Sequence, residues 1–338
     1  MSQHFLGVDL HGKRTYVVLM DKDGEVKDRR RLLNSEVGEY AAKLPPRTCA
    51  VLESTGNWSY MYDVLEAKLE RVELAHPKGV RAIAAARVKT DRIDATILAH
   101  LLRTNLLPTS YAAPLPTREL RDITRHRSKL VRERTRHKNR IHRVLSRYNI
   151  HSPCTDLFGK RGQEFLRDTL PELSNLHQQI ISDFLYMINC LNERIKQADR
   201  YIMQWSKTDS RAPLLMSMPG IGIYSASIII AEIAEIDRFP RAKELCSYAG
   251  LVPSTRSSDT RTYHGRITKQ GSPWLRWIMI SASQRSALSS PRLKIFYDRI
   301  AQKHGKKTAR VALARKMLSI VFFMLSRSQP FMEEYQQG

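Results

Sequence analysis

Residues 118–147 constrain the fold most, because this segment contains neither glycine nor proline and carries twelve lysines and arginines against three acidic residues. A segment of this length without a helix-breaking residue is predicted to form one long helix. Its cations would repel one another in isolation, so we expect a bound polyanion to neutralise them. The alternative is an ordinary solvated helix face. A long helix here also separates the part of the chain before it from the part after it.

The whole chain shares this excess of positive charge. Its 338 residues include 56 Lys and Arg and 33 Asp and Glu, for a formal net charge of +23. Such a charge favours nucleic acid or an acidic membrane surface as the partner. No apolar run reaches the roughly 20 residues that span a bilayer, and the 4 cysteines are scattered singly, which fits a reducing compartment. We therefore expect a cytoplasmic nucleic-acid-binding protein with no membrane partner.

Residues 1–110 alternate short apolar runs with segments of helical periodicity. The runs are rich in β-branched residues and predict strands at 5–10, 15–21, 26–33 and 48–55. The first three are joined by short turns, whereas the later ones are separated by helical segments. This order predicts an α/β domain with a mixed sheet.

Four acidic residues of this domain stand where metal chemistry would need them. Asp9 ends the first predicted strand, Glu53 closes the fourth, and Asp91 and Asp94 begin a helix on one of its faces. Each alone has an ordinary explanation, such as a helix cap or a loop residue. Together they predict a pair of Mg²⁺ ions, or Mn²⁺, about 3.5–4 Å apart and suited to phosphodiester chemistry. This combination is typical of ribonuclease H and Holliday-junction-resolvase (RuvC-like) folds.

A second long helix is predicted from residue 173 to about 205. Its apolar positions alternate steps of three and four, which is a heptad seam: Ile181, Phe184, Ile188, Leu191, Ile195, Ala198 and Ile202. The seam fits packing within the chain or an intermolecular coiled coil. We favour the second interpretation, which predicts a dimer or tetramer. The expected domains are therefore 1–110, a basic helical segment 111–150, a coiled-coil helix 151–207, and a mainly helical unit 208–338.

Two features of residues 208–338 are candidates for contact with phosphates. The turn at 219–222, Pro-Gly-Ile-Gly, resembles a helix–hairpin–helix element, although it equally fits a structural turn between packed helices. Ser254, Ser257 and Ser258 are predicted to lie in a polar loop, flanked by Arg256, Arg261, Arg266 and Lys269. A serine hydroxyl among cations is able to attack phosphorus, but a serine-rich loop alone does not single out a nucleophile.

Five short motifs, taken together, resemble a known family. In chain order they are Gly7-Val8-Asp9, Leu52-Glu53-Ser54-Thr55-Gly56, Lys89-Thr90-Asp91-Arg92-Ile93-Asp94-Ala95, Pro219-Gly220-Ile221-Gly222 and Tyr248-Ala249-Gly250-Leu251-Val252-Pro253. They span nearly the whole chain and resemble the DEDD-type insertion-sequence transposases of the one-ten/eleven-eleven family, also called bridge recombinases.

The resemblance implies a RuvC-like domain, a coiled coil and a second transposase domain that supplies a serine nucleophile to a composite active site. It implies that the catalytic and metal-binding acids are Asp9, Glu53, Asp91 and Asp94. The family serine follows the Ala-Gly-Leu-x-Pro motif by five positions, which selects Ser258, with Ser257 as the alternative. Asp259 stands where the family has glycine. A non-coding bridge RNA is implied to pair with donor and target DNA.

The predicted contacts with nucleic acid are cations of the basic segment and of the serine region. They are Arg125, Arg127, Lys129, Arg132, Arg134, Arg136, Lys138, Arg140, Arg143, Arg256, Arg261, Arg266 and Lys269. The function that follows is an RNA-guided DNA recombinase with a covalent 5′-phosphoserine intermediate. The alternatives are a RuvC-like nuclease that cuts by hydrolysis and a nucleic-acid-binding protein without catalysis.

Overall fold

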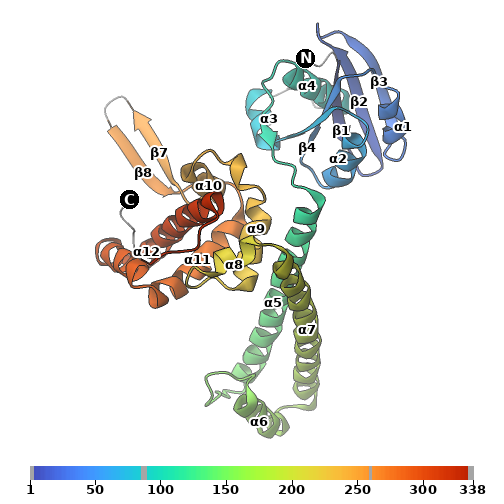
Figure 1. Ribbon diagram of the computed structural model, residues 1–338. Helices are drawn as coiled ribbons and strands as arrows, with labels where there is room; N and C mark the ends of the chain where they lie inside the picture. Colours follow the sequence, from blue (N-terminus) through green and yellow to red (C-terminus); the bar gives the residue numbers. More distant parts are fainter. Residues whose placement is uncertain (1–3, 85–89, 259–260, 334–338) are drawn as a thin grey trace. The chain divides into compact units, whose positions relative to one another are not determined.

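The computed structural model describes residues 4–84, 90–258 and 261–333; the side chains of 255–258, 261, 262 and 264 lie outside the description. The chain divides into two compact units, residues 1–113 and 114–338. Figure 1 labels their helices and strands.

Unit 1 is a mixed sheet with helices on both faces. The strands are β1 (His4–Leu10), β2 (Arg14–Asp21), β3 (Val26–Leu33), β4 (Thr48–Glu53), β5 (Arg71–Ala75) and β6 (Thr109–Ser110). The helices are α1 (Val37–Ala42), α2 (Trp58–Glu66), α3 (Pro77–Ile83) and α4 (Asp91–Arg103). The sheet order is β3-β2-β1-β4-β5-β6. The first three strands are antiparallel, and β4 and β5 then run parallel to β1. The mixed α/β domain predicted from the sequence is thereby confirmed.

The two faces of this sheet are covered by different helices. In β1, Leu6 and Val8 belong to the core that also contains residues of α1 and α2. A smaller core of Val51, Ala75 and residues of α3 and α4 covers the opposite face. Figure 1 shows α1 and α2 on one side of the sheet and α3 and α4 on the other. Because side chains alternate along a strand, the odd-numbered residues of β1 and β4 face α4.

Gly7 is the point of closest approach between β1 and α4. A Cβ atom on Gly7 would lie 1.9 Å from the carbonyl oxygen of Ala95 and 2.9 Å from the amide nitrogen of Ala99. Both are backbone atoms, so the helix itself would have to move. Only glycine therefore lets α4 lie this close to β1, which brings the start of α4 toward the end of β1.

We expect Gly7→Ala to destabilise unit 1 by about 3 kcal/mol, the upper end of the usual cost of overpacking. Gly12→Ala is the matched control, because no atom lies within 4 Å of a Cβ at that position. The control should change stability by less than about 0.5 kcal/mol. Thermal unfolding followed by circular dichroism measures the difference. Equal melting temperatures for the two variants would contradict the close packing.

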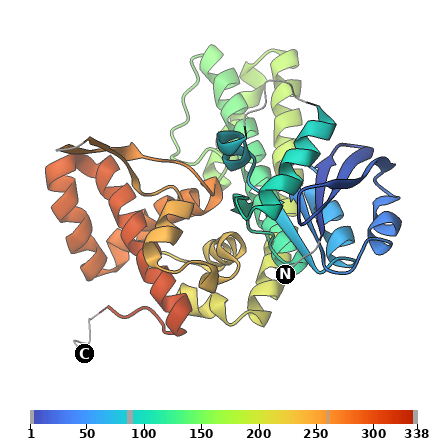
Figure 2. The ribbon, with the colours of Figure 1, turned by 90° about the horizontal axis from the view of Figure 1, so that it is seen from above.

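Unit 2 begins with a helical hairpin. Its elements are α5 (Leu115–Arg147), α6 (Lys160–Thr169) and α7 (Asn175–Thr208). α5 and α7 run side by side in opposite directions, green and yellow-green in Figures 1 and 2. The long basic helix and the second long helix predicted from the sequence are both present.

The heptad seam of α7 packs within the chain. Ile181 and Ile188 are buried in one core with Ile141, Val144 and Leu145 of α5. Farther along the seam, Ile195, Ala198 and Ile202 are buried as well. The interpretation that we favoured from the sequence, an intermolecular coiled coil through this seam, is therefore corrected. The partner of α7 is α5 of the same chain, whose apolar stripe is narrow and was masked in the sequence by the abundant arginines.

The rest of unit 2 is a helical domain that carries one β-hairpin. Its elements are α8 (Arg211–Met216), α9 (Ile223–Ile233), α10 (Ala242–Tyr248), β7 (Pro253–Ser258), β8 (Arg261–Ile267), α11 (Pro273–Ser289) and α12 (Pro291–Arg327). α11 and α12 each start at a serine that caps the helix ahead of a proline, Ser272 and Ser290. α12 bends at Gly305, where φ is +80°. None of the helices in the described residues combines the length and apolar character that spanning a bilayer requires.

The structure corrects the prediction for the serine region and bears on the two interpretations of the Pro-Gly-Ile-Gly turn. The serine region is not an irregular loop: residues 253–258 form β7, which pairs antiparallel with β8. Polar strands such as these lack the apolar alternation by which strands are recognised. At the Pro-Gly-Ile-Gly turn, a Cβ on Gly220 (φ +86°) would lie 2.6 Å from Ser286 Oγ. The hydroxyl of Ser286 also donates a hydrogen bond to the carbonyl of Pro219 at 2.6 Å. These contacts favour the structural interpretation of the turn.

Candidate metal centre and nucleic-acid interface

Two carboxylates and one imidazole meet at the end of β1. His11 Nε2 lies 3.1 Å from Asp9 Oδ2 and 3.2 Å from Asp91 Oδ1. Asp9 belongs to β1, and Asp91 is the first residue of α4. Residues 82 positions apart in the chain are thus joined through a single side chain. We call Asp9, His11 and Asp91 the acidic cluster.

The sequence positions Asp91 through the cap of α4. The side chain of Thr90 accepts a hydrogen bond from the amide of Ile93 at 3.3 Å, which starts the helix at Asp91. Asp94 lies in the same first turn. Together with the close packing at Gly7, this cap directs the first turn of α4 toward Asp9.

The electrostatics of the cluster are those of crowded negative charge. Burial raises the pKa of the Asp9 carboxyl above its ordinary value, and the charges of Asp94 and Asp91 raise it further. His11 acts in the opposite direction and lowers this pKa. Asp94 therefore lies within electrostatic reach of Asp9. Like charges held together in this way are what a divalent cation would stabilise.

Glu53 lies at the corresponding end of the neighbouring strand. β1 and β4 are parallel and paired up to Val8 and Leu52, so Asp9 and Glu53 each follow the last pair. Strand alternation places both on the face that α4 covers. Of the four predicted acids, the structure thus joins Asp9 and Asp91 through His11, places Asp94 near them, and puts Glu53 on the adjacent strand.

The residues present fit a divalent ion. Asp9, His11 and Asp91 each offer a ligand atom, and these atoms all lie within 4.8 Å of one another. Carboxylate oxygens suit Mg²⁺ and Mn²⁺, and an imidazole nitrogen is a ligand for transition metals rather than for Mg²⁺. Oxygen atoms dominate the set once Glu53 and Asp94 are included.

His11 was not predicted from the sequence. A single histidine in a turn is not a metal signal by itself. The available signal was its spacing: it follows Asp9 by two residues, so at strand periodicity the two side chains extend to the same side of the sheet.

Ser258 is the last residue of β7, and Arg261, the first residue of β8, pairs with it. The segment between them, including Asp259, lies outside the described residues, as do the side chains of Ser257, Ser258, Arg256 and Arg261. Arg266 and Lys269 are exposed along the returning strand and just beyond it. The predicted nucleophile therefore belongs to the far end of a two-stranded hairpin.

The basic residues of α5 fall on two sides of the helix. One set is exposed and recurs at steps of three and four, which defines a stripe on one face: Lys129, Arg132, Arg136, Arg140, Arg143 and Arg147. We call this set the basic stripe. At 1.5 Å per residue it extends for about 27 Å. All of its members except Arg147 were among the predicted contacts with nucleic acid.

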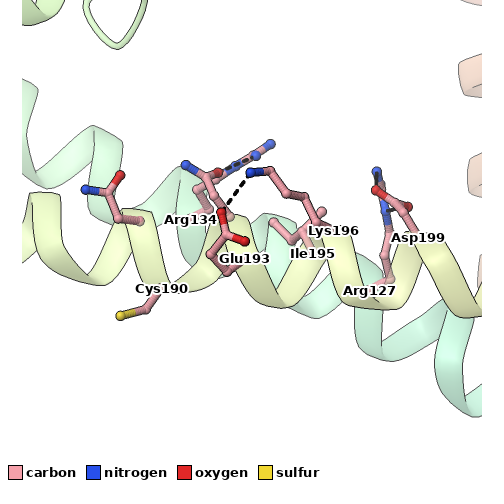
Figure 3. A pocket seen from close by; sticks show the side chains of 9 residues that line it. Arg127, Arg134, Cys190, Glu193, Ile195, Lys196 and Asp199 are labelled. Carbon is pink, nitrogen blue, oxygen red and sulfur yellow. Dashed lines mark hydrogen bonds and ion pairs between the residues drawn. The ribbon is translucent and has the colours of Figure 1, made fainter.

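The other set faces the rest of unit 2 and has partners there. Arg127 Nε donates to Asp199 at 2.9 Å, and Arg134 donates to Asn192 at 2.8 Å. Both line an open polar pocket of about 670 Å³ beside α7, in which Figure 3 also shows Lys196 next to Glu193. Arg125 pairs with Glu232, and Lys138 lies over the ring of Phe158. These cations join α5 to its neighbours.

Comparisons with known proteins agree on one family. A family model described as "Transposase IS116/IS110/IS902 family" matches residues 212–298, and a "Transposase" model for the DEDD type of IS110 elements matches residues 6–150. The chain is 25% identical to a probable family 20 transposase of Pseudomonas aeruginosa, over 97% of this chain and 98% of the relative.

Two further relatives have more specific names. The transposase for insertion sequence element IS1111A of Coxiella burnetii is 24% identical, over 96% of this chain and 90% of its own. A pilin gene-inverting protein of Moraxella bovis is 26% identical, over 83% of this chain and 81% of its own. With both family models matched in order and relatives aligned over nearly the full length, the chain belongs to the IS110 family of DEDD transposases.

Proposed function

We propose that this transposase is an RNA-guided DNA recombinase with a composite active site, in which the acidic residues of unit 1 and Ser258 of unit 2 act on one phosphodiester. The observation that carries the proposal is the convergence of Asp9 and Asp91 on His11 at the end of β1. The strand order of unit 1, three antiparallel strands followed by two parallel to the first, supports a RuvC-like assignment.

The acidic residues would hold the metal. Asp9 and Asp91 would bind it directly, with Glu53 and Asp94 completing the oxygen ligands; His11, which bridges the two carboxylates, would give up these contacts or become a ligand itself. A bound Mg²⁺ or Mn²⁺ polarises a phosphate oxygen and neutralises the charge that develops on it. Burial raises the pKa of Asp9, and the nearby charges of Asp94 and Asp91 raise it further; these like charges, held close to Asp9, support cation binding at this position.

Ser258 forms the covalent intermediate. Its Oγ attacks the phosphorus, the Oγ–P bond forms as the bond from phosphorus to the 3′ oxygen breaks, and the serine proton passes to solvent while the leaving 3′ oxygen takes up one. The product is a 5′-phosphoserine and a free 3′ hydroxyl. Attack by the 3′ hydroxyl of a second DNA strand reverses the step and joins the exchanged ends. One phosphoester replaces another, so no ATP is needed.

A relative named as a pilin gene-inverting protein supports strand exchange, since inverting a DNA segment requires that cut ends be rejoined. The guide in our proposal is a bridge RNA from the element, which pairs with donor and target DNA. A protein that recognises paired strands by their backbone needs positive charge more than base-reading side chains, and the net charge of +23 meets that need. The assembly is proposed to be a dimer or tetramer because the family resemblance implies an active site built with partner subunits; its contacts would lie outside the seam of α7, which is buried within the chain.

The proposal is tested by incubating the protein with RNA from its element, donor and target DNA and Mg²⁺, then searching for DNA that stays attached after denaturation. We expect an adduct that requires the metal and is absent with a chelator. Cleaved ends without an adduct, under conditions where RNA is bound, would favour the hydrolytic nuclease. No cleavage and no adduct, with binding intact, would favour the non-catalytic alternative.

The basic stripe predicts a specific salt dependence. Changing Arg136, Arg140 and Arg143 to Gln removes three exposed cations, so the slope of log affinity for duplex DNA against log salt should fall by about 2.7. The same change at Arg194, Lys196 and Arg200, three exposed cations of α7, is the control for net charge. Fluorescence anisotropy at several salt concentrations measures both slopes. Equal slopes for the two triple variants would remove the stripe from the interface.

A further inference from the structure

Glu232 is the one acidic residue of α9, and apart from Ser227 the other buried residues of this helix are apolar. Its side chain is only 3% exposed, and residues 226–233 of α9 are all buried. Burying a charge is costly unless it is paired and hydrogen-bonded. The cost of burying this carboxylate must therefore be offset, and its hydrogen bonds to neighbouring elements offset it.

The two oxygens of Glu232 bind two different elements. Oε1 accepts hydrogen bonds from Nε and Nη2 of Arg125 on α5, at 3.0 and 2.7 Å. Oε2 accepts a hydrogen bond from the hydroxyl of Ser272, which caps α11, at 2.8 Å. α5 and α11 are thus joined through one buried side chain. The ring of Trp274, two residues beyond Ser272, lies 5.1 Å from the guanidinium of Arg132 in the basic stripe.

Ser272 stands at the base of the β7–β8 hairpin. Its amide donates to the carbonyl of Tyr248 at 2.8 Å, while the amides of Lys269 and Thr268 donate to Gly250 and Val252 at 3.2 and 2.9 Å. These three bonds close the base of the hairpin.

The backbone at the base of the hairpin is closely packed against the end of α10. A Cβ on Gly271 (φ +89°) would lie 2.0 Å from the carbonyl oxygen of Tyr248. Arg276 also donates to the carbonyl of Ala249 at 2.9 Å. A shift of Ser272 would therefore be transmitted to the strands rather than absorbed by the loop.

We propose that Glu232 is a positioning residue that fixes the base of the β7–β8 hairpin relative to α5. Nucleic acid bound to the basic stripe and the serine at the end of the hairpin are thereby held in a fixed position relative to each other. The consequence for catalysis rests on the function proposed above. Arg125, predicted to contact nucleic acid, acts instead as the anchor of Glu232 on α5. Glu232 itself touches no substrate and acts through Ser272.

The first test measures the protection of backbone amides at the hairpin base by hydrogen-exchange mass spectrometry on the full chain. Glu232→Gln keeps the shape of the side chain but removes the charge that binds Arg125. We expect the amides of Thr268, Lys269 and Ser272 to exchange at least tenfold faster, with rates in α12 changed by less than twofold. Asp199→Asn is the matched control, because it removes another carboxylate paired with an arginine of α5, Arg127, in a pair that joins α5 to α7 and not to α11.

A second variant separates pairing from general loss of structure. Adding Arg125→Gln to Glu232→Gln replaces the ion pair with two neutral amides able to hydrogen-bond, so exchange at the hairpin base should recover toward wild type. Unchanged exchange in Glu232→Gln would overturn the proposal. Equal acceleration in α12 would also overturn it, because Glu232 would then stabilise the whole unit rather than position the hairpin.

The rate of adduct formation measures the consequence of this positioning for catalysis. Glu232→Gln should form the protein–DNA adduct at least tenfold more slowly, with affinity for DNA and RNA within about twofold of wild type, and Asp199→Asn should match wild type in both. An unchanged adduct rate would overturn the link to catalysis. If wild-type protein forms no adduct at all, the proposed serine chemistry fails, while the exchange measurements still decide whether Glu232 positions the hairpin.

Discussion

Asp9→Asn is expected to reduce strand cleavage by at least about a thousandfold, corresponding to about 4 kcal/mol of lost transition-state stabilisation. The variant should nevertheless be as stable as wild type or more so. Burial and the charges of Asp94 and Asp91 raise the pKa of Asp9, so ionising this carboxyl costs more free energy in the folded protein than in the unfolded chain, and a neutral side chain removes that cost.

Metal binding gives this prediction a readout other than activity. Mg²⁺ or Mn²⁺ should raise the melting temperature of wild-type protein and leave that of Asp9→Asn unchanged. Asp23→Asn, at an exposed turn between β2 and β3, is the control and should keep both activity and the metal effect. A metal-induced stabilisation that survives in Asp9→Asn would place the ion elsewhere, and full activity in this variant would exclude the acidic cluster from catalysis.

Ser258→Ala is expected to abolish the covalent adduct completely, because alanine has no oxygen with which to form the phosphoester. Binding of DNA and RNA should stay within about twofold of wild type, since no charge is removed. Denaturing gel electrophoresis with labelled DNA detects the adduct, and anisotropy measures binding. The distinction between loss of chemistry and loss of binding is what identifies a nucleophile.

Ser257→Ala is the neighbouring control, and its adduct should remain within about tenfold of wild type. Loss of the adduct in Ser257→Ala but not in Ser258→Ala would transfer the role to Ser257. An adduct in both single variants and in the double variant would contradict the serine mechanism.

Much of unit 1 was predictable because its signals are local. β1, β2 and β4 are apolar runs between turns, and Thr90 with Asp91 marks the start of α4. Asp9 and Asp91 were therefore identified from sequence as neighbours in space. His11 was not, because its role depends on where α4 begins relative to the end of β1, and that depends on the close packing at Gly7.

Unit 2 was less predictable because its decisive contacts join distant segments. The heptad seam of α7 was recognised, but its partner was not, since α5 presents few apolar residues among many cations. Nor was Glu232 singled out: one acid in an apolar helix has no meaning until Arg125 and Ser272 are seen beside it. The β7–β8 hairpin was interpreted as a loop because its strands are polar.

The antiparallel pairing of α5 and α7 makes this helical hairpin an arm. Its length is independent of the segments that precede α5 and follow α7. The chain leaves along α5 and returns along α7, so both ends of the arm lie together, and the segment 148–174 alone closes the far end. Removing one heptad from each helix near that end would keep the seam in register and leave the helical domain as it is. A change in the arm's length would alter the length of nucleic acid that the basic stripe is proposed to bind, while unit 1 and the helical domain from α8 to α12 stay unchanged.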